Sequence, residues 1–130
     1  MTAKVTKTKK KVLPIVDEVL VSVHSTFNNT IITASIVGSG NVIGWTSSGQ
    51  AGFKGAKKGT PYAATTAMKT LLDKIAEYQP NSIQIRVVGA GNGRDAALRA
   101  IAGSGYKVTS IADVTPLPHN GTRPKKARRV

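Results

Sequence analysis

The chain has 130 residues, the length of one domain, with no cysteine and a formal net charge of +13. It contains no apolar run of the roughly 18 residues that a membrane helix needs, and its charged N-terminus lacks the apolar segment of a secretory signal. The absence of cysteine excludes disulfides, thiolate metal sites and thiol nucleophiles.

The first half of the chain predicts an antiparallel meander of three strands. Residues 18–26 alternate apolar and polar side chains, and residues 30–37 are rich in β-branched residues. Between them, Asn28-Asn29 predicts a two-residue hairpin turn, because asparagine tolerates positive φ. The sequence GSGN at 38–41 predicts a second turn, before a third strand at 42–48.

The second half alternates helices with strands. Thr60 and Pro61 are typical of a helix start, and apolar residues then recur at helical spacing until Pro80-Asn81. A strand at 82–88, a short helix at 94–102 and a strand at 107–114 follow. The order βββαβαβ predicts an α/β fold with a mixed five-stranded sheet and helices packed on it.

Charge divides the chain into three parts. Five lysines lie within residues 1–11 and five basic residues within 114–130, and neither segment contains an acid. We therefore predict a flexible basic arm at 1–14, a single α/β domain at 15–116, and a basic tail at 117–130 that is disordered when free. A solubilising role for these ends is possible, but a polyanion such as nucleic acid is the favoured partner.

The loop GQAGFKGAKKGT at 49–60 repeats this positive charge inside the domain. It is not a Walker A loop, which requires Gly-Lys-Ser/Thr, because the order here is Lys58-Gly59-Thr60. Its glycines permit close approach to a partner, and Lys54, Lys57 and Lys58 are candidate phosphate contacts. Phe53 either stacks on a base or packs on the core, and packing is favoured.

The segment GAGNGRD at 89–95 follows a strand and opens a helix, as a dinucleotide-binding loop does. The fingerprint fails at its third glycine, because position 94 is arginine. Two interpretations remain: a structural turn that needs glycine, or an anion site in which helix amides and Arg94 favour an RNA phosphate.

A catalytic function is disfavoured by the distribution of acids. A nuclease of the ribonuclease H kind needs several carboxylates that converge on divalent metal ions. Only six acids exist, in positions typical of solvated helix faces and strand ends, and the two histidines lack metal-ligand spacing. We predict neither enzyme activity, nor a metal, nor a cofactor.

Four segments together resemble a known family. HSTFNNTIIT at 24–33, GWTSSGQAGFKGAKKGTPYAA at 44–64, VVGAGNGRDAALRAI at 87–101 and DVTPLPHNGTRPKKARRV at 113–130 are similar, in order and spacing, to the bacterial small-subunit ribosomal protein of the eleventh family. That family usually has prolines where Ala90 and Asn92 stand.

The resemblance implies a ribonuclease-H-like sheet that serves as an RNA-binding scaffold in the cytoplasmic ribosome. It further implies a place on the platform of the small subunit, where the protein bridges rRNA helices and shapes the cleft that holds the mRNA's Shine–Dalgarno segment. The implied protein neighbours are the seventh and eighteenth small-subunit proteins, with no membrane partner and no homo-oligomer. The rRNA-binding candidates from charge and resemblance are His24, Asn28, Asn29, Lys54, Lys57, Lys58, Arg94, His119, Asn120, Arg123, Lys125, Lys126, Arg128 and Arg129.

One rival interpretation remains at this point. A DNA- or RNA-binding module that acts away from the ribosome would have a similar composition and charge distribution.

Overall fold

The computed structural model describes residues 15–129, so the basic arm predicted at 1–14 lies outside the described residues. The elements follow the predicted order: β1 (Glu18–Ser25), β2 (Thr30–Ile36), β3 (Val42–Ser47), the 3₁₀ helix η1 (Gly55–Gly59), α1 (Pro61–Ala76), β4 (Ser82–Val88), α2 (Gly93–Ala102) and β5 (Lys107–Asp113). The predicted strand and short-helix boundaries are correct to within one residue.

The five strands form one mixed sheet in the order β3-β2-β1-β4-β5. β1 pairs antiparallel with β2, and β2 pairs antiparallel with β3, as the predicted meander requires. β1 pairs parallel with β4, and β4 pairs parallel with β5, because a helix crosses over before each of the last two strands. The predicted fold class is confirmed.

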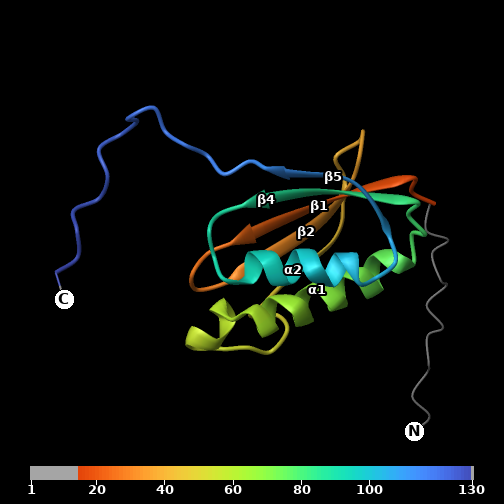
Figure 1. Ribbon diagram of the computed structural model, residues 1–130, viewed down its shortest axis with the longest axis horizontal. Coiled ribbons are helices and arrows are strands. Elements are labelled where there is room, and N and C mark those ends of the chain that lie inside the picture. The colour runs from red at the N-terminus through yellow and green to blue at the C-terminus, as the bar shows by residue number, and fades with distance from the viewer. Residues whose placement is uncertain (1–14, 130) are drawn as a thin grey trace, which may run out of the picture.

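Both helices lie on the same face of the sheet, and the other face is not covered by a helix (Figure 1). The covered face carries the alternate apolar residues of β1, β2 and β4, such as Val21, Ile32 and Ile85, which are buried. α1 packs Met68, Leu71 and Ile75 against them, all three fully buried. Each such side chain contributes about 1.5–3 kcal/mol to folding, so this layer holds the domain together.

Helix α1 begins where the sequence indicates. The Thr60 hydroxyl accepts a hydrogen bond from the amide of Ala63, at 3.3 Å, and Pro61 occupies the first helical position. Every apolar position at helical spacing between Ala64 and Ile75 is buried. Neither helix in the described part of the chain has the length and apolar character needed to cross a membrane.

Candidate nucleic-acid interface

Four connections meet at one end of the sheet, which we call the loop edge. It consists of the β1–β2 hairpin (26–29), the loop from β3 to α1 (48–60), the turn from β4 to α2 (89–92), and the chain that leaves β5 (114–115). β1, β4 and β5 are parallel, so their carboxyl ends meet there, and Figure 1 shows the start of α1 at the same end. Segments far apart in the sequence thus form one surface.

The β1–β2 hairpin is organised by Thr26. Its hydroxyl accepts hydrogen bonds from the amides of Asn28, at 3.4 Å, and Asn29, at 3.1 Å, while its own amide donates to the Asn29 carbonyl at 2.8 Å. Ser25 pairs with Thr30, so the connection has four residues between the strands. The prediction of a two-residue turn with positive φ is therefore wrong: neither asparagine has positive φ, because a threonine hydroxyl closes the turn instead.

Asn28 is exposed at the tip of this hairpin, where its side chain is accessible to a partner. Asn29 is partly committed, because its side-chain oxygen accepts a hydrogen bond from the Thr30 amide at 2.9 Å. His24 precedes the hairpin and is exposed on the sheet face that carries no helix, next to Ile31 of β2. These three predicted site residues are therefore neighbours at the loop edge.

The lysine-rich loop is more ordered than the sequence indicates. Residues 55–59 form η1, and the Thr60 hydroxyl donates a hydrogen bond to the Lys57 carbonyl at 2.7 Å. Lys54 and Lys57 are exposed, and Lys58 is half-buried. Within residues 15–129, none of these three lysines forms an ion pair with a carboxylate. Their charges are available to an anionic partner.

Gly59 joins this loop to the hairpin. It is buried, and a Cβ atom at its position would collide with the backbone carbonyl oxygen of Phe27. Any larger residue would force the two connections apart. The glycine therefore serves close packing within the protein, in addition to the close approach to a partner that the sequence predicts for this loop.

The turn from β4 to α2 packs against the hairpin in the same way. The Gly91 amide donates to the Ser25 carbonyl at 3.1 Å, and a Cβ on Gly91 would collide with the Thr26 carbonyl. Asn92, at the start of α2, is exposed and forms no side-chain cap. The structural reason for these glycines is thus visible, and the first turn of α2 still faces the loop edge.

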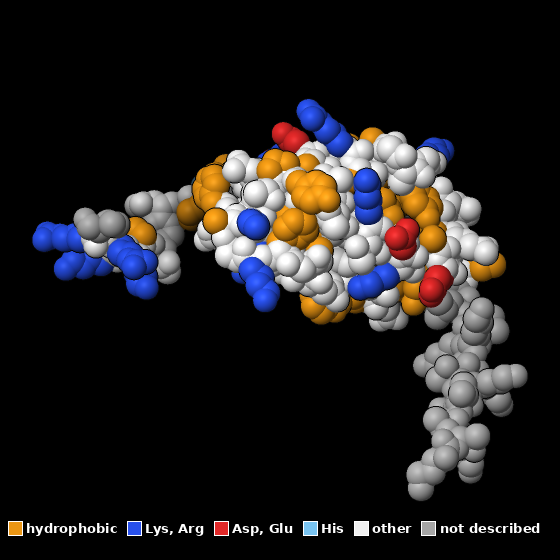
Figure 2. Space-filling view, turned by 90° about the horizontal axis from the view of Figure 1, so that it is seen from below, with side chains coloured by type: hydrophobic (Ala, Val, Ile, Leu, Met, Phe, Trp, Pro, Cys, Tyr) orange, Lys and Arg blue, Asp and Glu red, His pale blue; other side chains and the backbone are white. Residues whose placement is uncertain are grey.

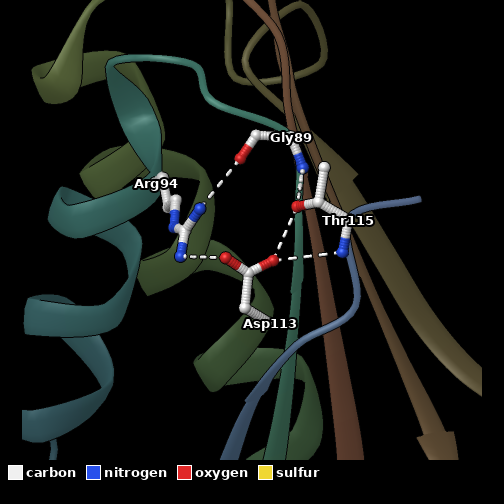
Figure 3. Close-up of polar contacts among 4 residues, drawn as sticks. All are labelled: Gly89, Arg94, Asp113 and Thr115. Atoms are coloured by element: carbon white, nitrogen blue, oxygen red, sulfur yellow. Dashed lines mark hydrogen bonds and ion pairs between the residues drawn. The ribbon is translucent and has the colours of Figure 1, made fainter. Parts of the chain in front are cut away.

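Arg94 belongs to a closed ring of polar contacts (Figure 3). Its guanidinium donates to the Asp113 carboxylate at 2.7 Å and to the Gly89 carbonyl at 3.1 Å. The other Asp113 oxygen accepts from the Thr115 hydroxyl, at 2.6 Å, and the Thr115 amide, at 3.0 Å. The Thr115 hydroxyl in turn accepts from the Gly89 amide at 3.1 Å, which closes the ring.

This ring shifts the titration of Asp113. The two hydrogen bonds from Thr115, and then the contact with Arg94, lower the pKa of Asp113 from 3.8 to about 2. The side chains of Arg94 and Asp113 are 31% and 48% exposed, so the pair is near solvent. Arg94 lies in the first turn of α2, as the sequence predicts, but the carboxylate of Asp113 offsets its charge. The ring also fixes the direction in which the chain leaves β5.

The tail then extends away from the domain (Figure 1). Residues 117–129 are exposed, and in the described part of the chain no hydrogen bond or ion pair ties them to the domain. Figure 2 shows the basic side chains of the tail well apart from those scattered over the helical face. The tail carries the predicted residues His119, Asn120, Arg123, Lys125, Lys126, Arg128 and Arg129.

Three aromatic residues accompany the lysines, and the sequence identified only one of them. Phe53 is half-buried and packs edge to face on Tyr62, with ring centroids 5.7 Å apart. Tyr62 is 72% exposed, and Phe27, at the hairpin, is 73% exposed. The sequence did not single out Tyr62, because it lies within the predicted helix, or Phe27, because it lies next to a predicted turn. The feature that identifies Tyr62 and Phe27 as candidates is their exposure on segments that meet at Gly59, next to the lysine-rich loop.

The acids at the start of β1 bond to neighbouring segments of the domain. Asp17 accepts a hydrogen bond from the Asn81 side chain at 2.8 Å, and Glu18 accepts one from Thr109 at 2.8 Å. No group of His, Asp and Glu side chains in residues 15–129 is arranged to hold a metal ion. Asp17 and Glu18 thus tie the start of β1 to the turn before β4 and to β5.

Comparison with known proteins identifies the family. A model of the family described as ribosomal protein S11 matches residues 19–129. The chain is 48% identical over 131 residues to small ribosomal subunit protein uS11 of Borreliella burgdorferi, covering all of both chains. It is 47% identical over 125 residues to the protein of the same name from Marinobacter nauticus, with 96% of each chain covered, and 48% identical over 124 residues to that from Neisseria meningitidis, with 95% and 94% covered. With a match over nearly its whole length, this chain belongs to the ribosomal protein S11 family.

Proposed function

We propose that this chain is a structural constituent of the small ribosomal subunit that binds rRNA through the loop edge and the basic tail. The observation that carries the proposal is the distribution of charge on this surface. Lys54, Lys57 and Lys58 lie together at the loop edge, and no acid occurs in the sequence from Val19 to Leu72. The tail, with five further cations, leaves the domain from the same edge.

The proposed contacts divide into three kinds. The three lysines and the basic tail residues neutralise phosphates, which supplies most of the affinity. Asn28, Asn29, His24, His119 and Asn120 supply polar contacts that depend on the local shape of the RNA. Arg94 contributes less charge than a free arginine, since Asp113 pairs with it.

Family membership supports a finer proposal for the place of the protein. We propose that it lies on the platform of the subunit in the cytoplasm, where it bridges rRNA helices and helps to form the cleft for the Shine–Dalgarno segment of the mRNA. Its protein neighbours would be the seventh and eighteenth small-subunit proteins. The protein is not an enzyme, in keeping with relatives that are named as ribosomal subunit proteins.

Co-sedimentation separates this proposal from a nucleic-acid-binding module that acts away from the ribosome. A tagged chain expressed in bacterial cells should migrate with the small subunit in a sucrose gradient and stay there in high salt. A protein that remains at the top of the gradient, or leaves the subunit at moderate salt, would contradict the proposal and favour the free module.

A further inference from the structure

We propose that Phe27 and Tyr62 form a stacking surface for an unpaired nucleobase, so that the loop edge binds looped or single-stranded RNA and not duplex backbone alone. This inference rests on the proposed rRNA-binding function and names the kind of RNA that the edge selects. Single exposed apolar residues are common on protein surfaces. These two differ because the Phe27 backbone meets the buried Gly59 of the lysine-rich loop, and Tyr62 follows that loop at the start of α1.

Tyr62 is held in place from one side. Phe53 contacts its ring at an interplanar angle of 84°, and the ring remains 72% exposed. The backbone beneath it is fixed by Pro61 and by the Thr60 cap of α1. A ring that is supported by one neighbour and otherwise largely exposed loses little conformational entropy when a base stacks on it.

Phe27 is held by its backbone. The Thr26 hydroxyl closes the hairpin that contains Phe27. The backbone carbonyl of Phe27 lies against Gly59, while the Phe27 side chain is 73% exposed. The hairpin that carries Phe27 and the loop that leads to Tyr62 therefore meet at one tightly packed backbone contact. Neither ring contributes to the buried core of the domain, so packing alone does not explain them.

The surrounding charge selects RNA over a protein as the occupant. Lys54, Lys57 and Lys58 lie in the same loop, unpaired with any carboxylate within residues 15–129. Lysines next to open aromatic rings match single-stranded nucleic acid, in which phosphates alternate with bases that have exposed π-faces. An apolar protein surface would leave these ammonium groups without partners and would bury them at a cost.

The test compares two RNA probes by fluorescence anisotropy. One probe is a single-stranded oligoribonucleotide of about 12 nucleotides, and the other is a blunt duplex of the same length. The variant Phe27→Leu with Tyr62→Leu keeps apolar volume but removes both rings. The matched variant Phe27→Tyr with Tyr62→Phe keeps the rings and exchanges the hydroxyl. Trp45→Leu removes an exposed aromatic residue from β3, and circular dichroism verifies that each variant folds.

Removal of stacking rings should weaken binding to the single strand roughly 5- to 100-fold. The slope of log affinity against log salt should stay the same, because no phosphate contact is lost. Binding to the duplex, the Tyr-Phe exchange and Trp45→Leu should all remain near the wild-type values. This pattern distinguishes stacking from a general loss of affinity.

Four outcomes would overturn the inference. Unchanged binding of the leucine variant to the single strand, or an equal loss on both probes, would show that the rings do not stack on bases. If the leucine variant binds both RNA probes normally but does not co-sediment with the small subunit, the rings contact a neighbouring protein instead of RNA. If the wild-type protein binds neither probe, the proposed function fails as well, and this result is distinct from the other three.

Discussion

Asp113 shows how individual contacts at the loop edge translate into a measurable property. Its pKa is lowered from 3.8 to about 2 in the folded protein. The hydrogen bonds to its carboxylate therefore stabilise the folded state at any pH above 3.8, the pKa of an unfolded aspartate. That contribution is lost as the pH falls from 3.8 through about 2. The ring around Asp113 should therefore remain intact in mildly acidic solution, where ordinary aspartates begin to take up protons.

Substitution Thr115→Val should raise the pKa of Asp113 toward 3.8, because the hydroxyl of Thr115 is the largest cause of the shift. The carboxyl chemical shift of Asp113, followed by NMR as a function of pH, gives the midpoint directly. Thr109→Val is the control, since Thr109 bonds Glu18 instead. A wild-type midpoint near 3.8 would show that the ring does not form in solution.

Gly59 tests the packing of the lysine loop against the hairpin. Gly59→Ala should lower the free energy of unfolding by about 1–3 kcal/mol, because the new methyl group collides with the Phe27 carbonyl. Gly49→Ala, in the same loop, meets only ordinary contacts, the nearest being the Lys58 side chain at 3.6 Å, and should be close to neutral. Urea unfolding measures both, and equal stabilities for the two variants would contradict the described contact.

At the scale of elements, the start of α1 depends on one side chain. Thr60→Ala removes the hydroxyl that accepts from the Ala63 amide, and should cost about 1 kcal/mol of stability. Thr70→Ala lies in the exposed interior of the same helix and should be neutral or slightly stabilising, since alanine is the better helix former. If thermal unfolding ranks these variants in the opposite order, the capping role is wrong.

The helices and strands could be predicted from the sequence because the spacing of apolar residues agreed with the positions of the glycine and proline breaks. Alternation in β1, helical spacing after Pro61 and the glycine-rich breaks each specified one state, and the helical crossovers indicated parallel pairing of the later strands. The connections could not be predicted as well. The Asn28-Asn29 pair indicated positive φ, yet the hydroxyl of Thr26 supplied a competing way to close the hairpin.

The candidate site was predicted in part for a similar reason. Clusters of basic residues can be recognised from the sequence alone, so the sequence identifies Lys54, Lys57, Lys58 and the tail as candidate phosphate contacts. The pairing of Arg94 with Asp113 and the exposure of Phe27 depend on which segments meet at the loop edge. Such juxtapositions arise from the tertiary structure and leave no periodic signal.

At the scale of the whole molecule, the charge is concentrated where the structure offers least apolar burial. The tail carries five cations on exposed residues beyond Gly121, whereas the domain combines its bases with all six acids. An extended cationic arm adds reach, and the folded domain supplies a fixed origin for it at the loop edge (Figure 1). The two parts should therefore contribute separately to RNA binding.

The most direct test of this account is the salt dependence of binding to a small-subunit rRNA fragment. Each phosphate neutralised contributes roughly 0.7 to 0.9 to the slope of log affinity against log salt. A chain that ends at Gly121 loses five cations, so its slope should be shallower by about 3.5 to 4.5 if each meets a phosphate. Replacement of Lys54, Lys57 and Lys58 by alanine should lower the slope by a further 2 or 3, approximately, because each lysine meets its own phosphate.

Circular dichroism should show the same folded domain in all these proteins, because the truncation lies beyond β5 and the three lysines are not part of the buried hydrophobic core. The two reductions in slope should add, because the tail and the loop lysines contact different phosphates. An unchanged slope after both changes, in proteins that remain folded, would show that neither the loop edge nor the tail binds rRNA phosphates.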